Sequence, residues 1–525
     1  MSSTLTLGPL LRYVDETTAS IWLQTSRAGT VEVRAGDSVA QAPTFTAHGY
    51  HYALVTLKDL TPASSVAYTI HFGTEQLWPE PQMPPSLIHT QGTPTSNQFI
   101  FGSCRAPMPY DEAHQKTHGT DVLKAYAHQL MGSEVKPPTA LILLGDQVYA
   151  DHLPPAMREY IAARRDLNVE PGAELSNFHE YAEMYRLSWD DPAIRWLLAS
   201  VPSVMIFDDH DVRDDWNTSA AWRAEIEAKP WWGPRITSAL GSYWIYQHIG
   251  NLSPTERAHD PLWRLAERGG DLTQALDEFA QVANADPSSY RWSYRRDFGH
   301  TRLLMLDTRC GRDLTPGARD MLPQWQWMHD QSEGDYQHLL IGSSLPVLLP
   351  PALHHAEQWN EKIADGSWGK RWAAFAERLR QTLDLEHWAA FIRSFGHLTD
   401  LAERVARKAP VTFLSGDVHY SYLARGDIAG INQVVCSPIR NPLSPFFRYA
   451  NVIASWRITA WCTRLLAKAA RCEPPRWRWK MTTKPFFNNV LARLDIKDQA
   501  QHVAWFTAEK DTSRTVELHQ SKLAP

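Results

Sequence analysis

The chain has 525 residues, more than one compact hydrophobic core usually contains, so two domains are expected. With 43% hydrophobic and 21% charged residues, its composition is that of a soluble globular protein. The formal net charge of −6 argues against a general nucleic-acid binder, which would usually be basic, so no stable nucleic-acid complex is expected.

The amino-terminal sequence MSSTLTLGPLLRYVDE lacks the basic start and the long apolar core of a secretion signal. No run of 18 apolar residues predicts a membrane span. The cysteines are too few for a disulfide framework and contain no CxxC pair; they are Cys104, Cys310, Cys436, Cys462 and Cys472. We therefore expect a cytoplasmic protein.

Residues 1–92 are predicted to form a small antiparallel β-sandwich domain. The runs ASIWLQTS, TVEVRAG, HYALVTLKDL and SVAYTIHFG alternate with period two, are rich in Val, Thr, Ile and Tyr, and are separated by Gly, Pro and Ser. The Pro-rich stretch WPEPQMPPSLIHTQGTPT is typical of a linker or a wrapping segment.

Residues 93–525 show a different pattern, with continuous apolar runs that each stop at a polar group. These runs are QFIFGSC, ALILLGDQVYAD, VMIFDDHD, RLLMLDTR, HLLIGSS, VTFLSGDVHYS and NQVVCSP. They predict strands buried on both faces, and the helical patterns between them predict a layered α/β domain. The segments 152–200, 215–297 and 315–410 are expected to be mostly helical insertions, and the final run, from NNVLARLDI to TVELHQ, to form closing strands.

The ends of these predicted strands carry residues that suit metal binding. They are Cys104, Asp146, Asp208, Asp209, His210, Asp307, Asp417 and His419. Ligands of open α/β sheets bind at the carboxyl ends of the strands, and acidic groups that converge there need a cation. Asp417 and His419 are two residues apart and would face the same way in an extended chain. Carboxylate, imidazole and thiolate together suit transition metals, and a metal pair bridged by a carboxylate suits phosphoryl transfer.

The motifs GSC, GDQVYAD, DDHD, LDTR and SGDVH, in this order, resemble those of the PhoD-like alkaline phosphatase family of metallophosphoesterases. The predicted amino-terminal sandwich is similar to the small β-domain that precedes the catalytic domain in that family. The resemblance covers most of the chain. It implies a layered metallophosphatase-type β-sandwich core flanked by helices and a metal-dependent hydrolase of small-molecule phosphate esters, either monoesters or diesters.

The resemblance also implies a dinuclear centre with Fe³⁺ beside Ca²⁺ or another divalent ion, Mn²⁺ or Zn²⁺. The residues around iron would be Cys104, Tyr149, Asp146 and His419. The second metal would be held by Asp146, Asp209 and Asp417. A metal-bound hydroxide would attack in line while His210 donates a proton to the leaving oxygen. Arg105 and Arg309 are candidates for contacts with the phosphate.

Several of these residues also have a purely structural explanation. Cys104 could be a small buried hydrophobic residue, Asp146 a helix cap, and Tyr149 a packing residue. Asp307 and Arg309 could simply pair with each other in the core. We expect Asp208 to bond to the backbone or to orient His210. The residues left open between support of the metals and helix capping are Asp151, Asp211, Asp214 and Asn217.

Two further segments have open roles. Adjacent His354 and His355 cannot share a helix face, so at most one would face the site, and the segment with Glu357 could line the pocket mouth. Residues 446–485 hold nine Lys or Arg against one acid, Glu473. A basic amphipathic helix with Trp can lie on a membrane surface, but we favour packing of its apolar face on the domain.

Two other functions therefore stay open beside the phosphoesterase. One is a binding or scaffold protein that has lost turnover, and the other is a peripheral membrane enzyme acting on lipid phosphates. Retention of the complete predicted ligand set argues against the scaffold. The sequence does not indicate the oligomeric state.

Overall fold

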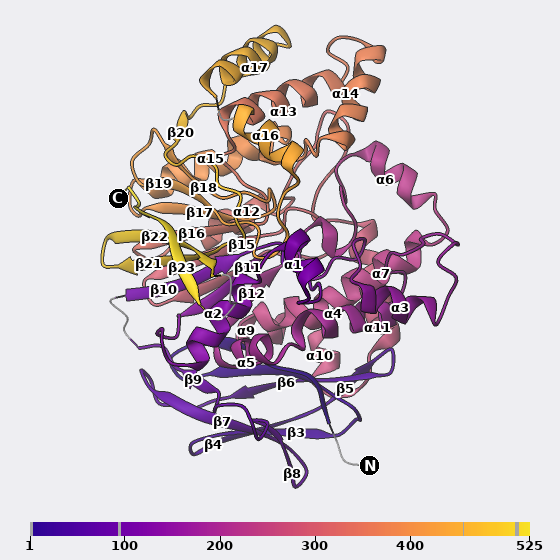
Figure 1. Cartoon of the computed structure of the whole chain (residues 1–525), viewed down its shortest axis with the longest axis vertical. Helices are drawn as coiled ribbons and strands as arrows, with labels where there is room; N and C mark the ends of the chain where they lie inside the picture. The colour runs from indigo at the N-terminus through magenta and orange to yellow at the C-terminus, as the bar shows by residue number, and fades with distance from the viewer. Residues whose placement is uncertain (1–3, 93–95, 455, 510–513, 525) are drawn as a thin grey trace.

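The structure is a computed structural model that describes residues 4–92, 96–454, 456–509 and 514–524. Figure 1 shows an all-β region formed by the start of the chain at the bottom, a core of β-sheets above it, and helices at the top and to the right. This arrangement confirms the predicted fold class, a layered α/β core flanked by helices and preceded by a small all-β sandwich.

Two mainly antiparallel sheets form the amino-terminal region. The first has the order β1–β2–β6–β5, and the second has the order β4–β3–β7–β8 with β9 paired to β7. The strands are β1 (Leu5–Val14), β2 (Ala19–Thr25), β3 (Thr30–Ala35), β4 (Ser38–Pro43), β5 (Phe45–Ala47), β6 (Tyr50–Leu57), β7 (Ser65–Phe72), β8 (Glu75–Trp78) and β9 (Leu87–His89). Side chains of β3 alternate between buried and solvent-facing positions, whereas β2 is buried throughout because Tyr246 and its neighbours pack on Trp22.

The core consists of two larger sheets. The first has the order β12–β11–β10–β21–β22–β23, with β10 (Ser96–Gly102), β11 (Ala140–Leu144), β12 (Ser203–Ile206), β21 (Leu491–Lys497), β22 (Ala500–Ala508) and β23 (Thr515–Lys522). The second has the order β14–β15–β16–β17–β19–β18–β20, with β14 (Tyr294–Phe298), β15 (Thr301–Leu306), β16 (His338–Ser343), β17 (Val411–Ser415), β18 (Tyr422–Gly426), β19 (Ile431–Val435) and β20 (Trp479–Met481). The predicted closing strands thus form one edge of the first sheet.

The central strands of both sheets are parallel: β10, β11 and β12 in the first, and β15, β16, β17 and β19 in the second. Every residue of β11, β15, β16 and β17 is buried, as the continuous apolar runs predicted. Since parallel strands end at the same edge of a sheet, the polar residues that follow them gather there.

The three long segments between strands are mainly helical, as predicted. They contain α3 (Pro155–Ala162), α4 (Phe178–Trp189) and α5 (Pro192–Ser200), then α6 (Ala220–Glu227), α7 (Trp232–Tyr243), α8 (Ile249–Asn251), α9 (Pro254–His259), α10 (Trp263–Ala266) and α11 (Thr273–Ala285), then α12 (Trp325–Gln331), α13 (Pro351–Ala364), α14 (Lys370–Thr382) and α15 (Ile392–Ala406). The other helices are α1 (Glu112–His118), α2 (Val122–Met131), α16 (Pro445–Ala454) and α17 (Arg457–Ala469). None of the helices in the described ranges is long and apolar enough to cross a bilayer.

A buried arginine joins the amino-terminal sandwich to the rest of the chain. Arg12 of β1 donates to the carbonyl of Gln247 at 2.6 Å and to Oδ1 of Asn251 at 2.8 Å. The short strand β13 (Gly270–Asp271), which lies within an insertion, also pairs with β5. The contacts of Arg12 and of β13 would make the amino-terminal region and the rest of the chain stabilise each other. The domain boundary between residues 92 and 93 stays a prediction.

Replacing Arg12 by methionine is therefore expected to lower the free energy of unfolding by about 3 kcal/mol, because buried acceptors lose a charged donor. Urea unfolding measures this change. Arg34→Met is the control, since the side chain of Arg34 is 53% exposed and should contribute less than about 0.5 kcal/mol. Equal effects of the two substitutions would contradict the proposed link.

Candidate metal centre

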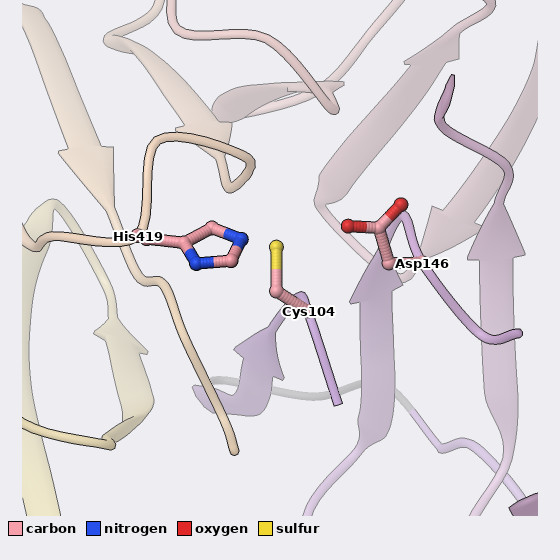
Figure 2. Close-up of side chains that lie close together, drawn as sticks. All are labelled: Cys104, Asp146 and His419. Atoms are coloured by element: carbon pink, nitrogen blue, oxygen red, sulfur yellow. The ribbon is translucent and has the colours of Figure 1, made fainter. Parts of the chain in front are cut away.

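Three strand ends bring a thiol, a carboxylate and an imidazole together. Cys104 follows β10, Asp146 follows β11 and His419 follows β17, so both sheets contribute. One ligand atom from each lies within 4.8 Å of the others, and Figure 2 shows the sulfur between the imidazole and the carboxylate. Such a group has the donor types and the spacing needed to hold one metal ion.

The backbone at this edge is held in an uncommon conformation. Positive φ angles of 58°, 52°, 65° and 55° occur at Cys104, Asp146, Asp417 and His419, respectively. A non-glycine residue in the left-handed region costs about 1–3 kcal/mol, and such residues concentrate at functional sites. Four of the six predicted metal ligands therefore carry backbone strain that the surrounding structure must offset.

Two glycines allow the strand ends to approach each other. Gly145 precedes Asp146 with φ of 110°, and a Cβ there would lie 2.7 Å from Cβ of Asp208. A Cβ on Gly416 would lie 2.1 Å from Oγ of Ser103. The same Ser103 hydroxyl accepts a hydrogen bond from the backbone of Asp417 at 3.1 Å, which ties the two sheets together beside the site. The glycines of the two GD motifs are thus required by close packing.

The thiol of Cys104 is buried in polar surroundings. Oγ of Ser437 donates to Sγ at 3.3 Å, and Oγ of Ser103 lies 3.1 Å away. Burial raises the pKa of Cys104 well above its ordinary value, and the charges of Asp146 and Asp417 raise it further. Without a cation the thiol would stay protonated, whereas a cation at this position would favour the thiolate.

Asp146 shows the same need for positive charge. Its Oδ1 is buried and has no hydrogen-bond partner among the described residues. Burial raises the pKa of Asp146 well above the ordinary range; His210 opposes this shift, while Asp208 and Asp209 add to it. Asp146, Asp208 and Asp209 have carboxylate oxygens within 4.8 Å of one another. An unpartnered oxygen among like charges fits a cation ligand rather than a helix cap.

Asp209 and Asp417, the other predicted ligands of the second metal, face a common cation of the chain. Nη2 of Arg309 lies 3.3 Å from Oδ1 of Asp209 and 3.5 Å from Oδ1 of Asp417. Burial raises the pKa of Asp209 to about 6, although Arg309 and His210 oppose it. Burial acts the same way on Asp417, but the hydrogen bond and charge of His387 together with the charges of Arg309 and His419 outweigh it, and the pKa falls to about 2.

The guanidinium of Arg309 binds carboxylates other than that of Asp307. Its buried guanidinium forms ion pairs with Asp208 and Glu386. Asp307 instead accepts hydrogen bonds from backbone amides, including that of Arg309 at 2.8 Å. Asp208 therefore holds Arg309, and it also forms a capping box with the turn of residues 209–211 that follows it.

Tyr149 and His419 are the other two predicted ligands of iron. The hydroxyl of Tyr149 accepts a hydrogen bond from Asn441 at 3.1 Å. Burial raises its pKa, and Asp146 and Cys104 add to this effect. Burial and the charge of His210 lower the pKa of His419 to about 4. Its imidazole is therefore neutral at pH 7, which is the form that binds metals.

His210 lies beside the ligands and is held by Asp151. Nδ1 of His210 is 2.9 Å from Oδ1 of Asp151, and the centroid of its ring lies 4.8 Å from that of Tyr149, with the two planes tilted by 34°. Burial would lower the pKa of His210, but the carboxylates of Asp151, Asp209 and Asp146 outweigh burial and raise the pKa well above its ordinary value. The imidazole therefore carries a proton at neutral pH.

Three of the residues with open roles, Asp151, Asp211 and Asn217, form hydrogen bonds around the DDHD motif. Asp151 orients His210, and Asp211 accepts hydrogen bonds from the amides of Asp146, Val148 and Asp208. Asn217 donates to the carbonyl of Arg309 at 3.2 Å. These side chains hold the loops that carry the predicted ligands.

Arg105, predicted to contact phosphate, forms hydrogen bonds with other groups of the protein. Its guanidinium donates to Asp121 at 2.9 Å, to the carbonyl of Ser188 at 2.6 Å and to the hydroxyl of Tyr110 at 3.2 Å. Asp121 caps α2, so these bonds tie the loop after β10 to helices. Each side-chain nitrogen of Arg105 thus already has a protein partner, which argues against a role in binding phosphate. The contact between Arg105 and phosphate stays a prediction.

Behind Asp417 lie Glu386 and His387, which no motif predicted, together with Glu357 from the segment expected at the pocket mouth. Nε2 of His387 lies 3.2 Å from Oδ2 of Asp417, and Nδ1 of His387 lies 2.7 Å from Oε1 of Glu357. Glu386 binds Arg309 from the same segment. These residues belong to a helical insertion and follow no strand. His354 is buried against Phe395 and Trp479, so Glu357 is the member of its segment that reaches the site.

A cavity of about 560 Å³ opens over these residues. Its polar side includes Asp146, Asp209, His210, Asp417 and His419. Its apolar side is formed by Leu349, Leu353, Trp359, Leu379, Leu383 and Leu443. The arrangement allows a charged group to reach the predicted ligands while an apolar group lies along the other side.

Comparison with known proteins gives two family matches. The sequence model described as PhoD-like phosphatase matches residues 115–441, and a domain of unknown function, DUF7800, matches residues 2–90. A solved structure described as "Structure of PhoD" is similar over 99% of this chain and 93% of that chain, with a TM-score of 0.59 and 13% identity, which shows a common fold.

A maltogenic amylase from S. marinus aligns over 98% of this chain and 81% of its own with 9% identity, but a TM-score of 0.17 carries no argument. No protein of the curated set matches the chain.

The family match defines the protein as a phosphatase, and the structure adds clusters of buried donor groups that are candidate metal sites. Since the family match covers more than half of the sequence, the chain belongs to the PhoD-like phosphatase family. Phosphatases of this family are metal-dependent enzymes, which agrees with the prediction of a metal-dependent phosphoesterase.

Glu357→Gln tests whether Glu357 and His387 support Asp417. Loss of this carboxylate should lower the pKa of His387 and weaken its hold on Asp417, reducing metal affinity or activity by about 10–100-fold. Metal titration and pH–rate profiles measure the effect. Glu361→Gln, also buried on α13 but paired with Arg319 and Arg380, is the control. Identical metal affinities of the two variants would show that Glu357 acts only in folding.

Proposed function

We propose that the chain hydrolyses phosphate monoesters or diesters at the cavity over the strand ends, with two cations held by its predicted ligands. Water cleaves a P–O bond, which leaves an alcohol and inorganic phosphate from a monoester, or an alcohol and a phosphate monoester from a diester. The observation that carries this proposal is the convergence of Cys104, Asp146 and His419 within 4.8 Å from three separate strands. No comparable observation favours a scaffold without turnover.

The donor sets support two different ions. Thiolate and phenolate from Cys104 and Tyr149, with Asp146 and His419, suit Fe³⁺, whereas the oxygen set of Asp146, Asp209 and Asp417 suits Ca²⁺, with Mn²⁺ or Zn²⁺ as alternatives. When bound, such ions would polarise the phosphoryl group and lower the pKa of a water molecule. Asp146 belongs to both sets, and its unpartnered Oδ1 supports that position.

His210 is proposed as the proton donor to the leaving oxygen. It lines the cavity beside Asp146 and Asp209, and Asp151 fixes its ring through Nδ1, which leaves Nε2 for the substrate. Oδ1 of Asp214 lies 3.8 Å from Nε2 of His210, which is too long for a hydrogen bond. Nε2 can therefore donate to the leaving oxygen of a substrate. A positioned imidazolium of this kind contributes about 10²–10⁴-fold to rate.

Arg309 is proposed to position Asp209 and Asp417, in addition to the predicted contact with phosphate. Its guanidinium reaches both carboxylates through one nitrogen, while Asp208 and Glu386 fix the other nitrogens. The arginine would thus hold the carboxylates of Asp209 and Asp417 at a defined distance from each other before a substrate binds.

The cytoplasmic location stays a prediction.

Asp146→Asn tests the central ligand. Protein purified without chelator should lose one or both ions, and kcat/KM for a chromogenic phosphate ester should fall by at least about 100-fold, because even residues that only support a ligand cost about 10–100-fold. Elemental analysis and steady-state kinetics measure both. Asp286→Asn, at the exposed end of α11, is the control and should change neither quantity. Unchanged metal content and hydrolysis in the Asp146 variant would refute the assignment.

His210→Asn tests the proton donor. The loss in kcat should be about 10²–10⁴-fold for an alkyl phosphate and much smaller for a nitrophenyl phosphate, whose leaving group needs no proton. In Asp151→Asn the pKa of His210 should fall, since a raising charge is removed, and the alkaline limb of the pH–rate profile should move to lower pH. An equal loss for both ester types would indicate another role for His210.

A further inference from the structure

The helix α17 lies at the outer end of a lobe built from α13, α14, α16 and α17, at the top of Figure 1. It packs on α13 through small residues: Ala467 and Ala470 are buried, and Ala460 and Thr463 are partly buried. These positions share one face of the helix.

The large apolar side chains of α17 point away from this contact. Ile458 is 74% exposed, Trp461 is 62% exposed and Leu465 is 44% exposed, and their spacing places them on one face. Nearby Trp456 and Tyr449 are also exposed. The expectation that the apolar face of this segment packs on the domain is therefore wrong for these residues.

The exposed tryptophans of the described chain are confined to the same lobe. They are Trp372 on α14, Trp456 before α17 and Trp461 on α17. A soluble surface seldom gathers large apolar side chains in this way, and such a patch indicates an interaction surface.

A basic stripe runs beside the apolar stripe on α17. Arg464 and Lys468 are exposed and lie one turn apart on the helix, and Arg471, also exposed, follows just beyond its last residue, Ala469. Residues 457–471 contain no acid. A helix with Trp and Leu on one face and Lys and Arg next to it has the composition of a helix that lies in the interface of an anionic bilayer.

The lobe is also part of the catalytic cavity. Leu353 and Trp359 of α13 and Leu379 of α14 contribute to its apolar side, and Leu443 and Asn451 line it from the segment of α16. Trp359 lines the cavity and also packs against the cluster that contains Ala470 at the end of α17. The helix α13, which supports α17, therefore also lines the cavity.

We propose that α17 docks on an anionic phospholipid surface and that the cavity acts on phosphate esters of lipids held in that surface. Charge complementarity and the large outward aromatic residues favour a bilayer over a protein partner as the occupant. The statement about substrates rests on the proposed phosphoesterase function, whereas the statement about docking does not.

Vesicle flotation of the full chain tests the docking. The protein should float with vesicles of phosphatidylcholine and phosphatidylglycerol, bind pure phosphatidylcholine weakly, and lose binding as salt rises. Arg464→Gln with Lys468→Gln should weaken binding by about fivefold for each charge removed. Trp461→Asp should abolish flotation while hydrolysis of a soluble ester stays unchanged, because Trp461 is outside the site.

Val282→Asp is the matched control, since Val282 is exposed to a similar degree on α11. It should float like the unmodified chain. Absence of flotation with every vesicle, or flotation unaffected by Trp461→Asp, would overturn the docking. A dimer in sedimentation velocity that Trp461→Asp converts to monomer, without vesicle binding, would show a second copy as the occupant and would also overturn it.

Hydrolysis of a lipid phosphate in the same vesicles tests the substrate class. We expect release of phosphate or of an alcohol from vesicle lipid, reduced in Trp461→Asp in parallel with binding. Bound protein that cleaves a soluble ester but no vesicle lipid would refute the lipid substrate alone. Bound protein that cleaves neither would refute the phosphoesterase function and leave the docking supported.

Discussion

The burial of acidic groups at one edge of the two core sheets requires compensating positive charge. Asp146, Asp208, Asp209 and Asp417 lie at or near the ends of buried strands together with the thiol of Cys104. Desolvation and mutual repulsion would force protons onto several of them, as the raised pKa of Asp146 shows. The chain supplies part of the compensation, and bound cations are proposed to supply the rest.

The chain's own cations have separate positions around the cluster. Arg309 reaches the carboxylates of the proposed second metal, His387 braces Asp417 from behind, and His210 faces the cavity. Within the described parts of the chain, Oδ1 of Asp146 has no such partner, and Asp146 lies near Cys104. The strained backbone at the strand ends is understandable in this setting, because it directs the donor groups toward one another at a cost that packing of the strands offsets.

Much of the fold and of the site follows from the sequence because apolar runs mark buried parallel strands and their polar ends mark the edge. Cys104, Asp146 and His419 were found in this way. Glu386 and His387 were missed since they lie in a helical insertion, where no strand end points to the site. The segment of Glu357 was expected at the pocket mouth, and Glu357 lines the cavity. The face of α17 was misjudged because its small residues, not its large ones, fit against α13. Which partner Arg105 takes likewise depends on tertiary packing.

The most direct test of the account is anomalous diffraction from crystals of the chain purified without chelator. The account predicts two peaks a few ångström apart, one within bonding distance of Sγ of Cys104 and one among the carboxylates of Asp146, Asp209 and Asp417. A well-ordered cluster with no metal peak, in which these side chains are held by hydrogen bonds of the chain alone, would contradict it.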